Sequence, residues 1–247
     1  MQGGCLCGAV RFRLDPPLRD VIACHCRQCR KTSGHFWAAT SVPLERFHLA
    51  ESKGLRWFHS SAKARRGFCG TCGTSLFWEP AGEGRISVAA GALEGPTGLT
   101  VASDWFLEDA GDYYSGGSAA PETLQGSCLC GKNHFTLPGL VREVTACHCR
   151  QCRKTSGHFA ASFDVAEAAL TWQAKSRTEF QTQGGGQRGF CGSCGGSLYF
   201  RARDGSFSVE AGIIDNPTGG QLTRHIFTAD KGDYDDLADG LAQSPGA

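Results

Sequence analysis

The feature that most constrains this chain is a cysteine pattern that occurs twice without change. Residues 23–36 and 146–159 have the same sequence, ACHCRQCRKTSGHF. In each copy a C-x-C motif precedes this segment, and an RGFC-x-x-C motif follows it. All fourteen cysteines of the 247-residue chain therefore fall into two matching sets of seven. An internal repeat of this length predicts two similar domains.

The repeats set the expected domain boundaries. Repeat 1 covers residues 1–115, and repeat 2 covers residues 123–240. Residues 116–122 between them are mostly Gly, Ser and Ala, which is typical of a flexible linker. Residues 241–247 are expected to form a disordered tail. A domain of this size has a thin core, which bound metal would help to stabilise.

Short segments of alternating apolar and polar residues predict β-strands. Such alternation occurs at residues 10–14, 86–90 and 207–211. Glycine-containing turns precede the second and third of these segments, and they predict β-hairpins. Only residues 142–154 and 164–170 favour a helical turn. The sequence therefore predicts an all-β fold.

The C-x-C and C-x-x-C motifs provide four cysteines in each repeat. These are Cys5, Cys7, Cys69 and Cys72 in repeat 1, and Cys128, Cys130, Cys191 and Cys194 in repeat 2. Four soft thiolates in two short pairs suit a tetrahedral structural zinc. A thioredoxin-like C-x-x-C would need a βαβ context, and a disulfide framework would leave one of each seven cysteines unpaired.

The other three cysteines of each repeat form a compact C-x-C-x-x-C motif. They are Cys24, Cys26 and Cys29 in repeat 1, and Cys147, Cys149 and Cys152 in repeat 2. Three protein ligands with a free fourth position are typical of a catalytic zinc. A thiol substrate in that position would lose its proton readily and attack a carbonyl carbon. These six cysteines are therefore candidate catalytic residues as well as candidate metal ligands.

Histidines near the three-cysteine motifs leave two interpretations open. His35 and His158 each follow the last cysteine of their motif by six residues. Either could supply the proton that the reaction needs. Either could instead become a fourth zinc ligand, which would make the site structural. His25 and His148 lie between two ligand cysteines, so their side chains are expected to point away from the metal.

The segments GGCLCGAVRF, CHCRQCRKTSG and RGFCGTCG resemble the glutathione-dependent formaldehyde-activating enzyme family, which includes the centromere protein V group. The resemblance covers both repeats, so the chain looks like a tandem duplication. It implies two zinc-stapled antiparallel β-tent domains, with structural zinc on the four-cysteine sets and catalytic zinc on the three-cysteine sets. Up to four Zn²⁺ are implied. The implied reaction is condensation of glutathione with formaldehyde to S-hydroxymethylglutathione, which is a carbon–sulfur lyase reaction in reverse.

The two repeats differ at positions near the expected sites. Repeat 1 has Asp104 where repeat 2 has His225, so the halves are expected to handle substrate differently. Ala160 stands in repeat 2 where repeat 1 has Trp37, which predicts a wider pocket in repeat 2. Two other functions stay open: a non-enzymatic protein-binding module with closed zinc sites, and a lyase for a different thiol adduct in a specialised or detoxification pathway.

The net charge and the lack of a long apolar segment limit the classes of partner that we expect. Fourteen thiolates and four divalent cations together would change the formal charge of +1 by −6, to −5. A basic surface for nucleic acid is therefore not expected. No signal sequence precedes Cys5 and no apolar run is long enough for a membrane span, so a cytoplasmic protein is expected. The expected partners are a small thiol, a small electrophile and, within the chain, the other repeat.

Overall fold

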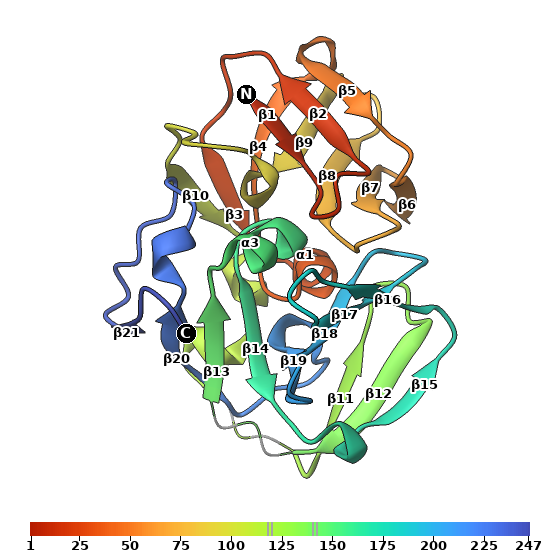
Figure 1. Ribbon diagram of the computed structural model, residues 1–247, viewed down its shortest axis with the longest axis vertical. Helices are drawn as coiled ribbons and strands as arrows, with labels where there is room; N and C mark the ends of the chain where they lie inside the picture. The colour runs from red at the N-terminus through yellow and green to blue at the C-terminus, as the bar shows by residue number, and fades with distance from the viewer. Residues whose placement is uncertain (118, 120, 140, 142) are drawn as a thin grey trace.

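The computed structural model describes every residue except 118, 120, 140 and 142, so the expected linker lies partly outside the described residues. Each repeat forms one small and one large β-sheet, and short helices lie between the two repeats (Figure 1). The predicted fold class is confirmed: the chain is mostly β, with two sheet-rich halves in tandem. In the described part of the chain, no helix is long and apolar enough to cross a membrane.

Repeat 1 contains a three-stranded sheet and a seven-stranded sheet. The small sheet has the order β1 (Gln2–Gly4), β2 (Arg11–Leu14), β5 (Phe47–Glu51). The large sheet has the order β10 (Val101–Trp105), β3 (Val21–Cys24), β4 (Trp37–Pro43), β9 (Arg85–Ala89), β8 (Ser75–Pro80), β7 (Ala64–Cys69), β6 (Leu55–Ser61). The helical segments are α1 (Arg27–Ser33), η1 (Leu44–Arg46), η2 (Ala90–Ala92), η3 (Leu107–Asp109) and α2 (Asp112–Ser115).

Repeat 2 reproduces this plan with one additional strand. The small sheet has the order β11 (Thr123–Ser127), β12 (Asn133–Pro138), β15 (Thr171–Ala174). The large sheet has the order β16 (Arg177–Gln181), β17 (Gln187–Cys191), β18 (Ser197–Arg201), β19 (Phe207–Glu210), β14 (Ala160–Asp164), β13 (Glu143–Cys147), β20 (Gln221–Ile226), β21 (Ala242–Gln243). The helical segments are α3 (Arg150–Ser156), η4 (Glu167–Ala169), η5 (Ala211–Ile213) and η6 (Thr228–Asp230).

The hairpins expected from the alternating segments form as β8–β9 and β18–β19. The resemblance implied antiparallel sheets, which is wrong near one edge of each large sheet. There β10 pairs in parallel with β3, and β20 pairs in parallel with β13. The long connections before β10 and β20 allow this, because a parallel neighbour cannot be reached through a tight turn.

The prediction that the last residues are disordered was also wrong. β21 extends the large sheet of repeat 2 by pairing in parallel with β20. Backbone bonds continue beyond this strand, where Phe227 N–H donates to the carbonyl of Gly246 at 2.8 Å. The edge of β20 provides unpaired backbone groups, which stabilise a segment whose own composition favours disorder.

The duplicated helices end at glycines that the local geometry requires. α1 ends at Gly34 with φ of 88°, and α3 ends at Gly157 with φ of 90°. This left-handed conformation favours glycine, because a Cβ would strain the backbone. The carbonyl of each terminal glycine accepts a backbone hydrogen bond from the other half. Gly91 N–H donates to the carbonyl of Gly157, and Gly212 N–H donates to that of Gly34, both at 2.8 Å. The two repeats therefore pack through reciprocal contacts, as the expectation of intramolecular pairing requires.

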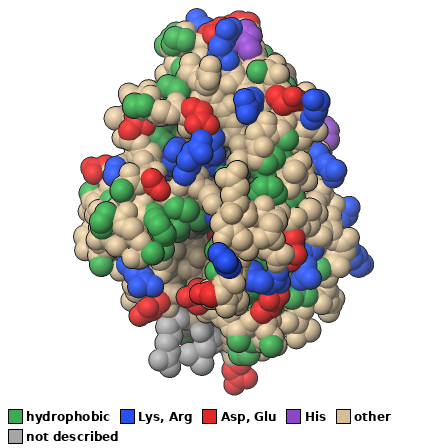
Figure 2. Space-filling view, viewed as in Figure 1, with side chains coloured by type: hydrophobic (Ala, Val, Ile, Leu, Met, Phe, Trp, Pro, Cys, Tyr) green, Lys and Arg blue, Asp and Glu red, His purple; other side chains and the backbone are tan. Residues whose placement is uncertain are grey.

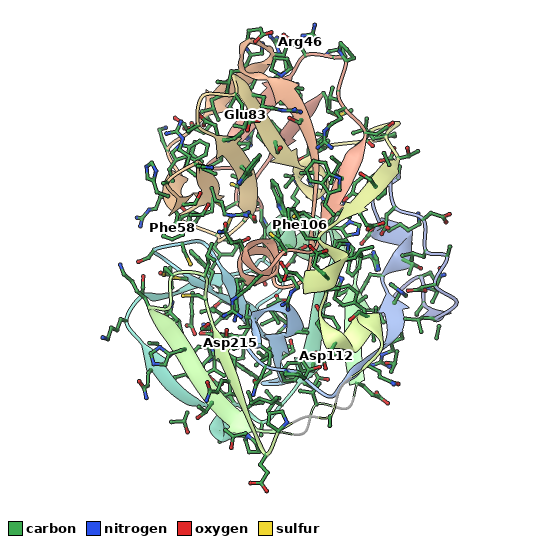
Figure 3. All side chains as sticks on the ribbon, turned by 180° about the vertical axis from the view of Figure 1, so that it is seen from behind. Arg46, Phe58, Glu83, Phe106, Asp112 and Asp215 are labelled. Carbon is green, nitrogen blue, oxygen red and sulfur yellow. The ribbon has the colours of Figure 1, made fainter. Side chains whose placement is uncertain are left out.

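The end of each repeat also packs against the other repeat. Tyr113 belongs to the buried cluster of repeat 2, and Tyr234 packs with Val21 and Ala38 of repeat 1. In Figure 3, Asp112 lies among the elements of repeat 2, and its carboxylate accepts a hydrogen bond from Gly219 N–H at 2.9 Å. Through this exchange of end segments, each half contributes a buried tyrosine to the packing of the other.

Replacing Gly91 by Ala should destabilise the interface between the repeats. A Cβ at Gly91 would lie 2.2 Å from the backbone oxygen of Arg153, which cannot move aside as a side chain could. We expect a loss of about 1–3 kcal/mol, which lowers Tm by about 2–4 °C per kcal/mol. Gly184→Ala is the control, because no atom lies within 4 Å of its added Cβ. Equal melting temperatures for the two variants would contradict this description of the interface.

Candidate metal and substrate site

The four-cysteine sets come together as the motifs predicted. In each repeat four Sγ atoms lie within 4.8 Å of one another. Two of the thiols come from the loop after the first strand of the small sheet, and two come from the turn between two strands of the large sheet. Val10 N–H donates to Cys5 Sγ at 3.2 Å in repeat 1. Asn133 N–H donates to Cys128 Sγ at 3.4 Å in repeat 2. Each cluster therefore joins the small sheet to the large sheet.

The three-cysteine sets also converge, with Sγ atoms within 4.8 Å of one another in each repeat. In repeat 2, Cys147 ends β13, Cys149 precedes α3 and Cys152 lies in the first turn of α3. A strand that runs directly into a helix places all three thiols on one side of the chain. All fourteen cysteines are free, so no disulfide competes with metal binding. Four cysteine clusters of this chain could hold metal.

The electrostatics of the three-cysteine clusters favour a bound cation. Hydrogen bonds from Cys24 and Cys29 lower the pKa of Cys26 to about 2. The pKa of Cys24 is raised, first because its thiol donates to Cys26. The thiols of repeat 2 behave in the same way, and the pKa of Cys149 is lowered to about 2. Thiols this close cannot all ionise without a positive ion, and soft thiolates suit zinc.

Two buried arginines provide part of the positive charge. Arg66 Nη2 lies 3.5 Å from Cys29 Sγ, and Arg188 Nη2 lies 3.3 Å from Cys152 Sγ. Both side chains are only 7% exposed. They come from β7 and β17, which carry the C-x-x-C motif that follows. Their positions favour compensation of thiolate charge over long-range attraction of an anionic substrate.

His35 and His158 lie near the boundary between the repeats, outside the sulfur clusters. His35 Nδ1 lies 2.6 Å from the hydroxyl of Tyr113, and His158 Nδ1 lies 3.4 Å from that of Tyr234. Among the described residues, no histidine nitrogen joins either three-cysteine cluster. Burial lowers the pKa of both imidazoles, to about 3 for His158. Their role as proton donors stays a prediction.

The histidines between the ligand cysteines point away from the sulfurs and into hydrogen-bond chains. His25 Nε2 lies 2.9 Å from Asp104 Oδ1. In repeat 2, His148 Nε2 lies 2.9 Å from His225 Nδ1, whose Nε2 lies 2.8 Å from Asp239 Oδ2. Asp104 and His225 stand at corresponding positions, so the residue that contacts the histidine differs between the repeats. In both repeats the series of hydrogen bonds ends at a carboxylate, that of Asp104 or that of Asp239.

A cleft of about 960 Å³ lies beside the three-cysteine cluster of repeat 2. Figure 2 shows the surface hollowed over β13 and β14, where this cleft lies. Its lining includes the ligand thiols and residues from six strands of the large sheet, among them Thr145, Cys147, Cys149, Cys152, Ala160, Ser162, Arg188, Phe200, Ser208, Glu210, Arg224 and Ile226. This volume is in the range of a site for a small molecule or short peptide.

Glu210 is a lining residue that the sequence did not identify as functional. Its side chain is 3% exposed, and Oε1 accepts a hydrogen bond from Ser197 Oγ at 3.1 Å. Within the described part of the chain, Oε2 has no hydrogen-bond partner. Burial, and then the charge of Cys152, raise the pKa of Glu210 to about 8. A comparison of the corresponding hairpins of the two repeats could have identified Glu210, because repeat 1 has Ala89 at the matching position.

Known proteins resemble single repeats of this chain. An uncharacterized lyase of Schizosaccharomyces pombe is 26% identical over 114 residues, which cover 46% of this chain and 82% of that protein. A crystal structure of a Rhodobacter sphaeroides protein matches 42% of this chain and 99% of its own, with 25% identity and a TM-score of 0.35.

A family model matches both repeats. The model of the glutathione-dependent formaldehyde-activating enzyme matches residues 1–109 and 123–230. The match includes every cysteine of the four clusters. Together with the name of the yeast relative, it supports a lyase-type enzyme. This chain belongs to the family of glutathione-dependent formaldehyde-activating enzymes.

Proposed function

We propose that this protein is a zinc-dependent carbon–sulfur lyase, in which a thiol adds to, or leaves, a carbonyl carbon. Glutathione and formaldehyde are the proposed pair, with S-hydroxymethylglutathione as their adduct. The observation that carries the proposal is a cluster of three thiols, with no fourth side-chain ligand among the described residues, beside a cleft. Membership of the family supports the choice of substrates.

The donor sets fit zinc, and we propose up to four ions in each chain. The four-cysteine sets would hold structural ions, and the three-cysteine sets would hold ions with one exchangeable position. When bound, zinc would supply a cation that lowers the pKa of a substrate thiol. A reducing, cytoplasmic setting is part of the proposal, because all fourteen cysteines must stay reduced to act as ligands.

The chemistry needs one proton in addition to the thiolate. In the synthetic direction the substrate thiol first loses its proton to solvent, its sulfur then forms a bond to the carbonyl carbon, and the carbonyl π electrons move to oxygen. The oxygen then takes a proton to give a hydroxyl. In the reverse direction the hydroxyl loses that proton, the carbon–sulfur bond breaks and its electrons return to sulfur.

We propose that Glu210 donates this proton in repeat 2. Glu210 is among the lining residues of the cleft, whereas His148 and His158 are not. Its raised pKa of about 8 keeps it protonated at neutral pH, so that it can donate. Arg188 lies in the same lining and faces Cys152, where its fixed positive charge would stabilise the thiolates during proton transfer.

Serine substitutions should separate the two kinds of cluster. Cys149→Ser should remove most activity with a small change in Tm, since its cluster joins residues that are close in sequence. Cys191→Ser should lower stability by about 3 kcal/mol or more, or about 6 °C in Tm, because its cluster joins segments far apart in the chain. Zinc content, thermal unfolding and NMR exchange rates for glutathione with formaldehyde are the measurements. Equal loss of stability in both variants would contradict the assignment.

Glu210→Gln should lower kcat by about a hundredfold, because a positioned general acid contributes about that much or more. KM and zinc content should change little, since the amide keeps the size of the side chain. The wild-type kcat should fall as pH rises through about 8, because the donor is then ionised. The variant should lack this decline.

His158, which the sequence analysis offered as a proton donor, provides the comparison with Glu210. If Glu210 is the donor, His158→Asn should lower kcat less than Glu210→Gln does. A large loss of kcat in His158→Asn, with Glu210→Gln unchanged, would return the role to the histidine and reject our assignment.

A further inference from the structure

We propose that the thiol substrate binds in repeat 2 alone, and that tryptophan side chains fill the corresponding face of repeat 1. This inference rests on the proposed function and assigns it to one of two similar sites. It concerns a difference between the repeats of this chain, which a shared motif does not reveal.

The cleft of repeat 2 is one face of its large sheet. Side chains alternate along each strand, so residues two apart share a face. Cys147 pairs with Ala160, and Thr145 pairs with Ser162. Ser162 in turn pairs with Glu210, and all of these residues line the cleft. The register therefore identifies the matching face in repeat 1.

Three tryptophans occupy that face in repeat 1. Trp37 pairs with Cys24, as Ala160 pairs with Cys147 in repeat 2. Trp105 pairs in parallel with Cys24, and its counterpart is Ile226. Trp78 pairs with Arg66 in β7, as Phe200 pairs with Arg188 in β17. Each replacement in repeat 1 is larger than the side chain that lines the cleft of repeat 2.

Trp37 is the most direct obstruction. It is 4% exposed and belongs to the same buried cluster as Cys29. Its Nε1 lies so close to the turn after α3 that a Cβ on Gly157 would be 2.6 Å away. An indole that is fixed between the three-cysteine cluster and the neighbouring repeat leaves little room for a peptide-sized thiol at this position.

The groups that we expect to act on substrate are also absent from repeat 1. Glu210 is replaced by Ala89, which removes the proton donor. Arg224, an exposed cation in the lining of the cleft, is replaced by Ser103. At this position a carboxylate-bearing thiol would therefore find a guanidinium partner in repeat 2 but a serine in repeat 1.

Repeat 1 still contributes to the site of repeat 2 through α1. A Cβ on Gly34, at the end of α1, would lie 2.7 Å from Glu210 Oε2. The buried Lys31 of α1 donates to the carbonyl of Ser127 at 3.0 Å and pairs with Asp215 at 2.7 Å. A metal in the cluster of repeat 1 would fix α1, and α1 buries the carboxyl that serves the other half.

The direct test is a crystal of the zinc-loaded full chain soaked with glutathione. We expect glutathione density, with its sulfur nearest the metal, at Cys147, Cys149 and Cys152 only. Density at both three-cysteine clusters, at the cluster of repeat 1 alone, or at neither would overturn the proposal. This readout does not depend on turnover.

Exchange of single residues between the repeats tests the same claim in solution. Ala160→Trp should lower kcat/KM for glutathione about tenfold or more, because it introduces the obstruction of repeat 1. Trp37→Ala should change kcat/KM less than about twofold. Zinc content and Tm show whether each variant is folded.

Arg224→Ser keeps the proposal testable if Ala160→Trp does not fold, because Arg224 is exposed. It should raise KM about tenfold, as expected for one lost charge-assisted contact. A loss of activity in Trp37→Ala with none in Arg224→Ser would assign the site to repeat 1. A wild-type chain inactive on glutathione and formaldehyde would instead reject the proposed function, and the soaked crystal would still decide which cleft accepts the thiol.

Discussion

The rest of this structure depends on the convergence of thiols into four tight clusters. Within each cluster, sulfurs from separate segments approach within 4.8 Å, a distance that repelling thiolates keep only beside positive charge. In the four-cysteine clusters the joined segments are about sixty residues apart, so one ion would hold two sheets together. In the three-cysteine clusters the segments are adjacent in sequence. A metal there would contribute less to the fold, which suits the chemical role that we propose for it.

Duplication of this unit has produced a molecule in which each half completes the other. The helix that contains the last cysteine of each C-x-C-x-x-C motif ends at a glycine, whose carbonyl accepts a backbone hydrogen bond from the opposite repeat. The end segments are exchanged, with Tyr113 and Tyr234 each buried beside the other half. Because of this mutual burial, repeat 1 contributes to the packing of repeat 2 even if the substrate face of repeat 1 is filled. The two identical fourteen-residue motifs have different surroundings, because the residues of the strands beside them differ.

The sequence predicted the clusters and the hairpins because short motifs determine them locally. Cysteine spacing, the alternation within β9 and β19, and the repeat itself needed no long-range information. The sequence did not predict the pairing of the last residues with β20 or the parallel edge strands, since both depend on which strand edge is free. In the sequence Glu210 is only one polar residue of the alternating segment 207–211, because its environment comes from α1 of the other repeat. Burial raised its pKa, and burial cannot be read from the neighbouring residues.

The central claim is that the three-cysteine clusters hold zinc with an exchangeable fourth position. Zinc-edge anomalous diffraction from crystals of the zinc-loaded protein tests it most directly, because it counts the ions and identifies the ligands of each. Our account predicts four zinc ions in each chain, two bound by four cysteines and two bound by three cysteines and a non-protein ligand. A protein side chain as the fourth ligand at Cys147, Cys149 and Cys152, or zinc at the four-cysteine clusters alone, would contradict the account.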